Sequence, residues 1–162
     1  MIVVSDTSPF SALLKTGHLS LLHQLYGEVI IPNAVFEELM ALKERGYDVE
    51  LRFKDEWIKV VRVKDTTMVN RLLQILDMGE AEAIILAKEL NADLLLIDEK
   101  EGRAFAKSEN LEIIGILGIL LEAKRNNFIL SVKQLLDDIV ENGNFRLSRL
   151  LYEDTLRRAD EF

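Results

Sequence analysis

Residues 2–6 read Ile-Val-Val-Ser-Asp, and residues 94–98 read Leu-Leu-Leu-Ile-Asp. Both are short, mostly aliphatic runs with the length and composition of a strand buried on both faces, and both end in an acidic residue. Similar runs near residues 28–31, 57–63 and 112–114 predict three more strands. The stretches between the runs have helical periodicity, so we expect strands and helices to alternate along the chain.

The order of these patterns predicts the fold class. Short strands of continuous Val, Ile and Leu separated by helices are typical of a parallel sheet covered on both faces. The prediction is a three-layer α/β/α sandwich around a five-stranded parallel sheet, in a single domain over residues 1–162 with a helical extension from about residue 127. Residues 46–56 are the least periodic and are expected to be a loop or a short mobile helix. Helices are predicted near residues 9–16, 18–26, 33–45, 66–76, 80–91, 99–109, 116–126, 131–141 and 147–159.

Composition limits the classes of protein that the chain can belong to. With 162 residues and 49% hydrophobic content, it has the size and apolar material of one ordinary domain. It has no cysteine, which excludes disulfides and thiolate metal sites. No apolar run approaches the roughly 20 residues of a membrane span, and no basic segment precedes Asp6. We therefore expect a cytoplasmic protein with neither a membrane segment nor a signal peptide.

The net charge of −8, from 20 basic and 28 acidic residues, argues against a protein that simply coats nucleic acid, because such proteins neutralise phosphates with Lys and Arg. A nucleic-acid partner would need bound cations or a local basic surface. Each candidate basic spot also has the pattern of an ordinary solvated helix face. These spots are Lys100/Arg103/Lys107, Lys124/Arg125 and Arg146/Arg149.

Two glutamates lie unusually close to the apolar side of predicted helices. On the helix that follows Pro32, a step of about 100° per residue places Glu37 opposite the apolar stripe and Glu38 about a quarter-turn from its centre. Only Glu38 could reach across the end of the sheet, although a boundary carboxylate paired with Lys or Arg has the same pattern. Glu80, just after Gly79, points toward small apolar neighbours that leave room for an ion. An acid in a first turn also complements the helix dipole, which is the structural alternative for Glu80.

Asp6 and Asp98 each follow a predicted strand. In open α/β sheets ligands bind at the carboxyl ends of the strands, where the strand order reverses. If the two strands are neighbours, the two acids stand side by side. Asp98 has a structural alternative, because residues 98–101 have the spacing of a capping box. A purely structural role is harder to assign to Asp6, because Ser8 before Pro9 is interpreted as the N-cap of the next helix.

A cluster of such acids would need a cation. Two carboxylates about 4 Å apart repel by roughly 4 kcal/mol at an effective dielectric near ~20. Either their pKa values rise or a cation compensates, and oxygen-only ligands favour Mg²⁺ or Mn²⁺ over zinc. His18 and His23, the only histidines, lie on an early helix away from these motifs and are expected to be ordinary surface or boundary residues.

Four motifs, taken in order, resemble those of PIN-domain proteins. The chain is similar to a prokaryotic PIN subfamily that is related to the VapC-type toxin ribonucleases of toxin–antitoxin pairs. The resemblance runs over residues 1 to about 120, and the subfamily's helical extension covers the rest. The motifs are Ser5-Asp6-Thr7-Ser8-Pro9, Ile31-Pro32-Asn33-Ala34-Val35-Phe36-Glu37-Glu38-Leu39, Gly79-Glu80-Ala81-Glu82-Ala83-Ile84, and Leu96-Ile97-Asp98-Glu99 with Gly102-Arg103.

The resemblance implies a strand order of 3-2-1-4-5, which makes the first and fourth strands neighbours. It implies that Asp6, Glu80 and Asp98 hold the metal and that Glu38 positions the attacking water, these four being the catalytic acids. The chain departs from the family pattern in having Glu80 where Asp is commoner and in having no Thr before the acid after the fourth strand. Three further residues would contact the substrate or support the metal ligands, namely Ser8, Glu99 and Arg103.

The expected activity is hydrolysis of phosphodiester bonds in RNA with one or two Mg²⁺ or Mn²⁺ ions. The metal lowers the pKa of the attacking water and stabilises the pentavalent phosphorus, so no covalent nucleophile is needed. The resemblance also implies a homodimer and a toxin role with a small antitoxin protein as partner.

Two alternatives come from other classes of protein. A PIN-like fold without catalysis could be an interaction module that works through dimerisation or its C-terminal helices. Residues 115–121, Gly-Ile-Leu-Gly-Ile-Leu-Leu, are apolar enough for either core or interface. A phosphoryl-transfer enzyme with Asp6 as nucleophile would usually carry a second Asp where this chain has Ser8. No glycine-rich phosphate loop is present in the sequence.

Overall fold

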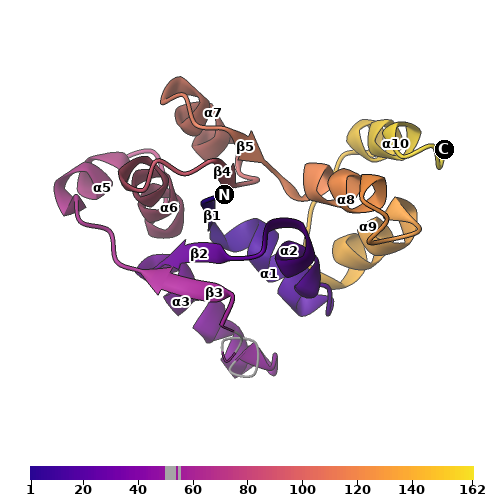
Figure 1. Ribbon diagram of the computed structural model, residues 1–162, viewed down its shortest axis with the longest axis horizontal. Helices are drawn as coiled ribbons and strands as arrows, with labels where there is room; N and C mark the ends of the chain where they lie inside the picture. The colour runs from indigo at the N-terminus through magenta and orange to yellow at the C-terminus, as the bar shows by residue number, and fades with distance from the viewer. Residues whose placement is uncertain (50–53, 55) are drawn as a thin grey trace.

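A computed structural model of the protein describes residues 1–49, 54 and 56–162. In this part of the chain, strands form a parallel sheet in the order β3-β2-β1-β4-β5 (Figure 1). The predicted fold class and strand order are therefore confirmed. The strands are β1 (Val3–Ser5), β2 (Val29–Pro32), β3 (Ile58–Val61), β4 (Leu94–Leu96) and β5 (Ile113–Ile114).

The central strand β1 pairs on both sides. Val4 pairs with Ile30 of β2 and with Leu95 of β4, both in parallel. The backbone N–H of Asp6 donates to the carbonyl of Leu96 at 2.9 Å, which extends the second pairing by one residue. The strand order reverses between β1 and β4, so their carboxyl ends lie next to each other at the place where open α/β sheets bind ligands.

Helices are present at every predicted position, with shifts of a few residues at their ends. The predicted helix over 33–45 is divided, because an α-helix ends at Met40 and a 3₁₀ turn continues to Arg45. Of the predicted loop over 46–56, residues 50–53 and 55 lie outside the described residues. The helices are α1 (Thr7–Lys15), α2 (Ser20–Tyr26), α3 (Asn33–Met40), the 3₁₀ helix η1 (Ala41–Arg45), α5 (Thr66–Leu72), α6 (Met78–Glu89), α7 (Lys100–Ser108), α8 (Ile116–Arg125), α9 (Val132–Asn142) and α10 (Arg149–Arg158).

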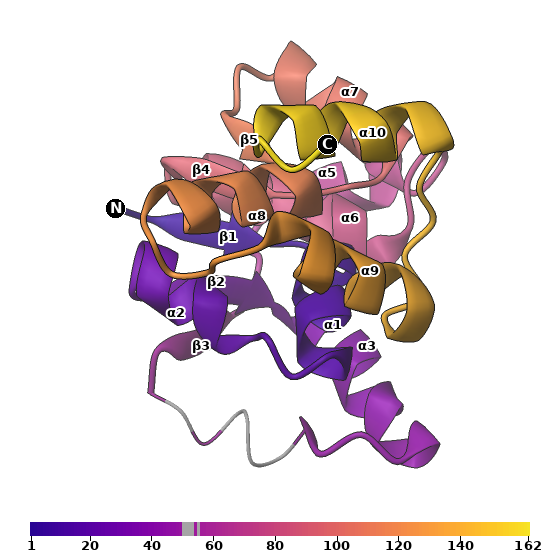
Figure 2. The same ribbon diagram turned by 90° about the vertical axis from the view of Figure 1, so that its right-hand side faces the viewer.

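Hydrophobic clusters lie on the two faces of the sheet because consecutive strand residues point in opposite directions. Val3 and Leu96 belong to one cluster, which contains buried residues of α1, α2, α3, α8 and α9. Val4 and Leu95 belong to the other, which contains buried residues of α5, α6 and α7. Figure 2 shows α8 and α9 stacked beside α1, with α5 and α6 behind the sheet. The three-layer arrangement follows from this division.

The C-terminal helices join the first cluster. Val132 and Leu136 of α9 are fully buried in the cluster that contains Phe10 and Leu13 of α1. The side chain of Glu161 accepts hydrogen bonds from the first turn of α9 and thereby ties the last residues to it. Among the described residues, no helix is both long enough and apolar enough to cross a membrane.

Candidate active site

Asp6 lies at the carboxyl end of the central strand and is only 2% exposed. Its backbone is extended, with φ −76° and ψ 174°, and it occupies the N-cap position of α1. The prediction that Ser8 is the N-cap is therefore wrong: β1 passes into α1 at Thr7, which places Ser8 and Pro9 inside the first turn. Asp6 thus lies both at a strand end and at a helix start.

The pKa of Asp6 is raised well above its usual range, mainly by burial. A hydrogen bond from the backbone N–H of Thr7 lowers it. The negative charges of Asp77, Glu80 and Glu38 then raise it further. These neighbours show that three acids, from α3 and from the start of α6, surround one buried carboxyl group.

Glu38 reaches the same place from α3. The hydroxyl of Thr7 donates to Oε2 of Glu38 at 2.5 Å. A Cβ atom at Gly79 would lie 2.7 Å from Oε1 of Glu38, so α6 approaches this carboxylate closely only because residue 79 is glycine. Burial raises the pKa of Glu38, the Thr7 hydrogen bond lowers it, and the charge of Asp77 raises it. Glu38, and not the neighbouring Glu37, lies beside the end of β1, as the helical periodicity predicted.

Glu80 takes part in a capping box at the start of α6. Its N–H donates to Oδ1 of Asp77 at 2.8 Å, and the Asp77 N–H donates to Oε2 of Glu80 at 3.0 Å. Burial raises the pKa of Glu80, the Asp77 N–H lowers it, and the charges of Asp77, Glu99 and Glu101 raise it. The capping box over 98–101, which was the structural alternative for Asp98, does not form, because the N-cap of α7 is Glu99 and its side chain makes no capping hydrogen bond.

Asp98 turns toward the start of α8. Its Oδ1 accepts the backbone N–H of Ile116 at 2.9 Å, and its Oδ2 is buried without a hydrogen-bond partner among the described residues. Burial raises the pKa of Asp98 to about 6, although the Ile116 N–H and the charge of Arg103 lower it and the charge of Glu99 raises it. Asp98 therefore fastens the end of β4 to the beginning of α8.

Arg103 and Gly115 also lie at the corner after β4, where Asp98 meets the start of α8. Nη1 of Arg103 donates to the carbonyl of Ile97 at 2.8 Å, so the guanidinium is held at the end of β4. A Cβ atom at Gly115 would lie 2.9 Å from the same Nη1 and would also contact Oδ1 of Asp98. Close packing at residue 115 thus requires glycine.

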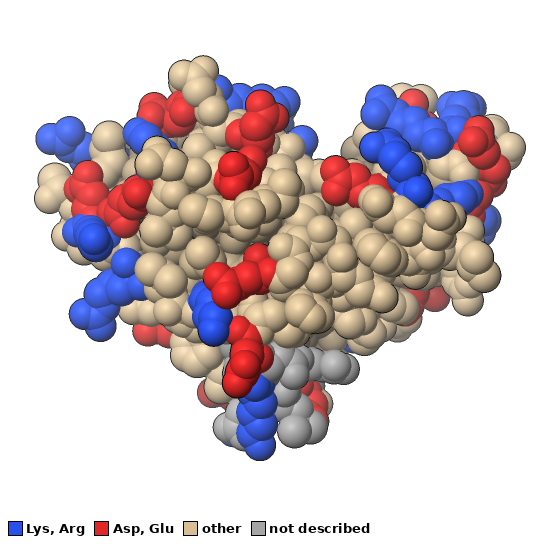
Figure 3. Space-filling model, viewed as in Figure 1, with Lys and Arg blue, Asp and Glu red and all other residues tan. Residues whose placement is uncertain are grey.

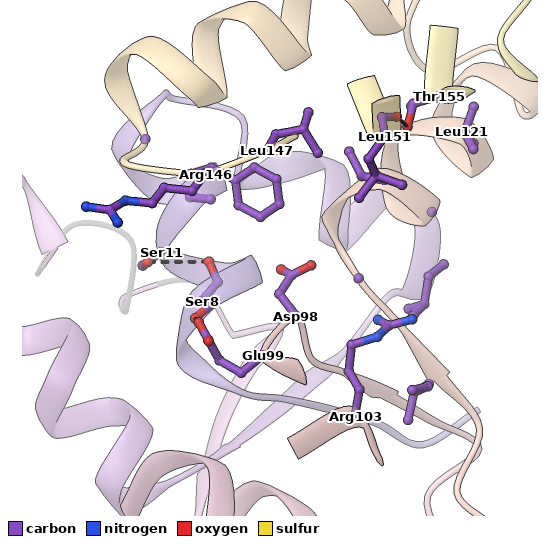
Figure 4. A pocket seen from close by; sticks show the side chains of 18 of the residues that line it. Ser8, Ser11, Asp98, Glu99, Arg103, Leu121, Arg146, Leu147, Leu151 and Thr155 are labelled. Atoms are coloured by element: carbon purple, nitrogen blue, oxygen red, sulfur yellow. Dashed lines mark hydrogen bonds between the residues drawn. The ribbon is translucent and has the colours of Figure 1, made fainter. Parts of the chain in front are cut away.

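The neighbouring acid, Glu99, turns the other way. The hydroxyl of Ser8 donates to Oε1 of Glu99 at 3.3 Å, and the charge of Glu99 raises the pKa of Glu80. Figure 4 shows Ser8 and Glu99 side by side and the Asp98 carboxylate pointing away from them. The structure therefore brings together Asp6, Glu38, Glu80 and Glu99, while Asp98 makes its contacts at α8.

The donor set suits a hard divalent cation, although the side chains do not yet converge on one point. Among the described residues, no three His, Asp or Glu side chains lie close enough together to hold a metal ion. One carboxylate oxygen of Glu38 accepts the Thr7 hydroxyl, and one of Glu80 accepts the Asp77 N–H. The side-chain charges that shift the pKa of Asp6 are all negative, and such an excess of carboxylate oxygens fits Mg²⁺ or Mn²⁺.

The histidines contact other parts of the molecule. His18 Nε2 lies 3.0 Å from Oδ2 of Asp138, and His23 Nδ1 lies 2.7 Å from the carbonyl of Gly27. The ring of His23 also stacks on Trp57 at a centroid distance of 5.1 Å. Both are half-buried or exposed, as the sequence predicted.

Sequence reasoning missed two residues of the site. Thr7 holds Glu38, and Asp77 adds a negative charge beside Asp6, Glu38 and Glu80. The Asp-x-x-Glu spacing from Asp77 to Glu80 is a capping-box signal that could have revealed the second of them.

Comparison with known proteins supports the same fold. The family model that matches residues 2–161 is described as a PIN domain. No curated protein matches the chain. Among solved structures, it is similar to a PilT N-terminus domain protein from the hyperthermophilic archaeon Sulfolobus solfataricus, with a TM-score of 0.55 and 22% identity over 76% of this chain and 93% of that one. At this identity the likeness shows the fold alone.

Proposed function

The chain belongs to the PIN-domain family, whose members are generally nucleases, and on this premise we propose that it is a Mg²⁺- or Mn²⁺-dependent ribonuclease. One observation supports the proposal above all. Asp6 is 2% exposed at a strand end, and three acidic side chains raise its pKa. Buried carboxylates without basic partners are costly unless a cation compensates them. A divalent ion bound by these carboxylates would offset that cost.

We assign the ion to Asp6, Glu80 and one of the two acids that follow β4. The sequence favoured Asp98, but the contacts favour Glu99. Glu99 faces Ser8 and raises the pKa of Glu80, whereas Oδ1 of Asp98 is engaged by the Ile116 N–H. Calorimetry with Mn²⁺ distinguishes them: Glu99→Gln should abolish tight binding and Asp98→Asn should retain it, and the reverse result would restore Asp98 as the ligand.

The remaining residues prepare water and substrate. A bound ion lowers the pKa of the attacking water and stabilises the charge that develops on phosphorus. Thr7 fixes one oxygen of Glu38, which orients that water, and the raised pKa of Glu38 makes it a stronger proton acceptor. Arg103 is committed to the Ile97 carbonyl and therefore supports the corner after β4.

The direct test is cleavage of end-labelled single-stranded RNA by the full chain with Mn²⁺ and with EDTA. Cleavage should require the ion and should disappear in Asp6→Asn with the circular dichroism spectrum unchanged. Glu37→Gln removes an exposed acid from the same helix as Glu38 and should cleave normally. Activity retained in Asp6→Asn would overturn the mechanism. No heat of Mn²⁺ binding at millimolar concentration would favour the catalytically inert interaction module instead.

The resemblance to VapC-type toxins also leads us to propose a homodimer, a small antitoxin protein as partner, and a cytoplasmic, single-domain protein. Exposed apolar side chains near the start of α6 offer a contact surface for a partner, with Leu73 38%, Ile75 60% and Met78 42% exposed. Light scattering tests the dimer. A short co-transcribed reading frame beside the gene, whose product co-purifies with the chain, would support the antitoxin.

A further inference from the structure

A pocket of about 850 Å³ opens beside the acidic site (Figure 4). Its walls come from α1, the corner after β4, α8, the segment between α9 and α10, and α10 itself. Ser8 and Glu99 line it and also form the hydrogen bond at the edge of the acidic site. The pocket therefore borders the proposed metal site at Ser8 and Glu99, and its volume is in the range of pockets that hold a ligand of nucleotide size.

One wall of the pocket is apolar and aromatic. Phe145 and Leu147 line it, and both are partly buried against the hydrophobic cluster that contains α1 and α9. A side chain that the core holds in place while it still faces a pocket makes a rigid surface for a planar ligand. Aromatic rings in such positions are the platforms on which single-stranded nucleic acids stack their bases.

The pocket also contains two cations that are not neutralised within the described chain. Lys15 and Arg146 line it, and neither makes an ion pair with a described residue. Burial, and to a smaller extent the charge of Arg45, lower the pKa of Lys15. By contrast, Arg158 is paired with Asp154 at 3.0 Å. Unpaired cations are conspicuous in a chain with a net charge of −8.

Basic side chains also gather over the helix that closes the pocket. α10 carries Arg149, Arg157 and Arg158, and Figure 3 shows Lys and Arg grouped at this end of the molecule, in the upper right of the view. Each of these arginines pairs with an acid of the same helix, Arg149 and Arg157 with Glu153 and Arg158 with Asp154. The positive charge left for a phosphate in the pocket is therefore that of Lys15 and Arg146.

The β4 end of the pocket presents hydrogen-bond acceptors. Asp98 lines the pocket, and its Oδ2 is buried without a donor among the described residues. Acceptors here match the hydroxyl groups of a ribose and the amino groups of a base, and they repel a phosphate. The distribution of charge therefore orients a nucleotide, with its sugar and base toward Asp98 and Phe145 and its phosphates toward Lys15 and Arg146.

From this arrangement we propose that the pocket binds one nucleotide of single-stranded RNA next to the bond that is cut, with its base against Phe145 and its phosphates at Lys15 and Arg146. The proposal rests on the nuclease function proposed above. In this proposal the segment between α9 and α10 positions the substrate. Lys15, Phe145 and Arg146 would contribute to the affinity for RNA and not to the rate of the chemical step.

The test measures binding separately from cleavage. The full chain carrying Asp6→Asn is titrated into a fluorescent single-stranded RNA with Mg²⁺, and binding is followed by anisotropy. Phe145→Leu keeps an apolar side chain but removes the ring, and it should weaken binding roughly tenfold. Phe128→Leu is the matched control, because Phe128 is 41% exposed and does not line the pocket, and it should bind normally. Thermal unfolding confirms that each variant is folded.

Removing the two cations gives an independent readout. Lys15→Ala with Arg146→Ala should weaken binding and reduce the magnitude of the slope of log K against log salt by about 1.4. The control pair Lys107→Ala with Arg125→Ala lies outside the pocket lining and should leave the slope unchanged. RNA containing 5-bromouridine should crosslink under ultraviolet light to the peptide that carries Phe145.

The outcomes separate this inference from the proposed function. If the native chain cleaves RNA but the pocket variants keep its KM, its affinity and its crosslinks, the pocket inference is overturned and the nuclease stands. If the native chain cleaves no RNA but the pocket variants lose RNA binding, the nuclease fails and the pocket stands. Single-stranded DNA of the same sequence bound as tightly as RNA would overturn the assignment of RNA as the ligand.

Discussion

Asp77 and Glu80 exchange two hydrogen bonds across the first turn of α6, at 2.8 and 3.0 Å. The same Glu80 carboxylate contributes negative charge at Asp6. An ion that draws Glu80 toward Asp6 takes the acceptor away from the Asp77 N–H, so ion binding and helix capping compete for one side chain. Asp77 therefore influences both the stability of α6 and the readiness of Glu80 to bind.

Substitution of Asp77 separates these two effects. Asp77→Ser keeps a good N-cap and should change stability little, whereas Asp77→Ala should cost about 1 kcal/mol in urea unfolding. Both variants remove a charge that raises the pKa of Asp6, so NMR titration should show that pKa lowered in both. Asp65→Ala removes the cap of α5 and is the control, because it should destabilise the protein without moving the pKa of Asp6. Equal stability of the Ser and Ala variants would contradict the capping role.

Asp6→Asn should raise the unfolding temperature of the metal-free protein. The folded-state pKa of Asp6 is raised, so the stability of the native protein falls as pH rises through the interval above the usual value of 3.8. The difference in unfolding temperature between the variant and the native protein should therefore increase from pH 4 to pH 7. Mn²⁺ at a hundred times its Kd should stabilise the native protein by about 2.7 kcal/mol and the variant not at all. Equal stabilisation of both proteins would place the ion elsewhere.

Gly115→Ala should destabilise the protein by about 1 to 3 kcal/mol, because the added methyl group would meet Arg103 and Asp98. Asp98 cannot easily withdraw, since the Ile116 N–H holds its Oδ1. In the Asp98→Ala background the same substitution should cost much less, which a double-mutant cycle in urea would detect. Additive effects would show that the two residues do not meet.

Glu161→Gln should destabilise the protein in a pH-dependent way. Burial raises the pKa of Glu161, but hydrogen bonds from Ser131, Lys124 and the N–H groups of Val132 and Lys133 outweigh it and lower the pKa to about 2. The ionised form is favoured in the folded state, so its stabilisation is complete above the usual value of 4.5 and disappears as pH falls to about 2. The difference in melting temperature between the native protein and the variant should be largest near neutral pH. A constant difference would contradict this assignment.

The sheet could be predicted from the sequence because a parallel strand that is buried on both faces consists of a continuous run of aliphatic residues. Val3, Val4, Leu95 and Leu96 face opposite clusters, and continuous aliphatic runs are what such two-sided burial requires. Helical periodicity likewise separated Glu38 from Glu37, since the two differ by about 100° on one helix.

The orientation of Asp98 and Glu99 could not be predicted in this way. Which of two adjacent acids faces the site depends on where β4 ends and on the packing of α8 against that end. The two Asp-x-x-Glu spacings, at 77–80 and 98–101, are equivalent in sequence. In the folded chain Asp77 and Glu80 form a capping box, whereas Asp98 accepts the Ile116 N–H. Tertiary contacts, and not local pattern, settle these positions.

The missing side chain at Gly79 has a consequence for how the site can be altered. Oε1 of Glu38 occupies the space that a methyl group at residue 79 would need. Glycine at this position therefore lets the Glu38 carboxylate stay close to the start of α6, where its charge acts on Asp6. The pKa of Asp6 thus depends on how closely the Glu38 side chain packs beside Gly79, and not only on which acids are present. A larger side chain at residue 79 that moved α3 away from α6 would change the pKa of Asp6 without removing any acidic residue from the sequence.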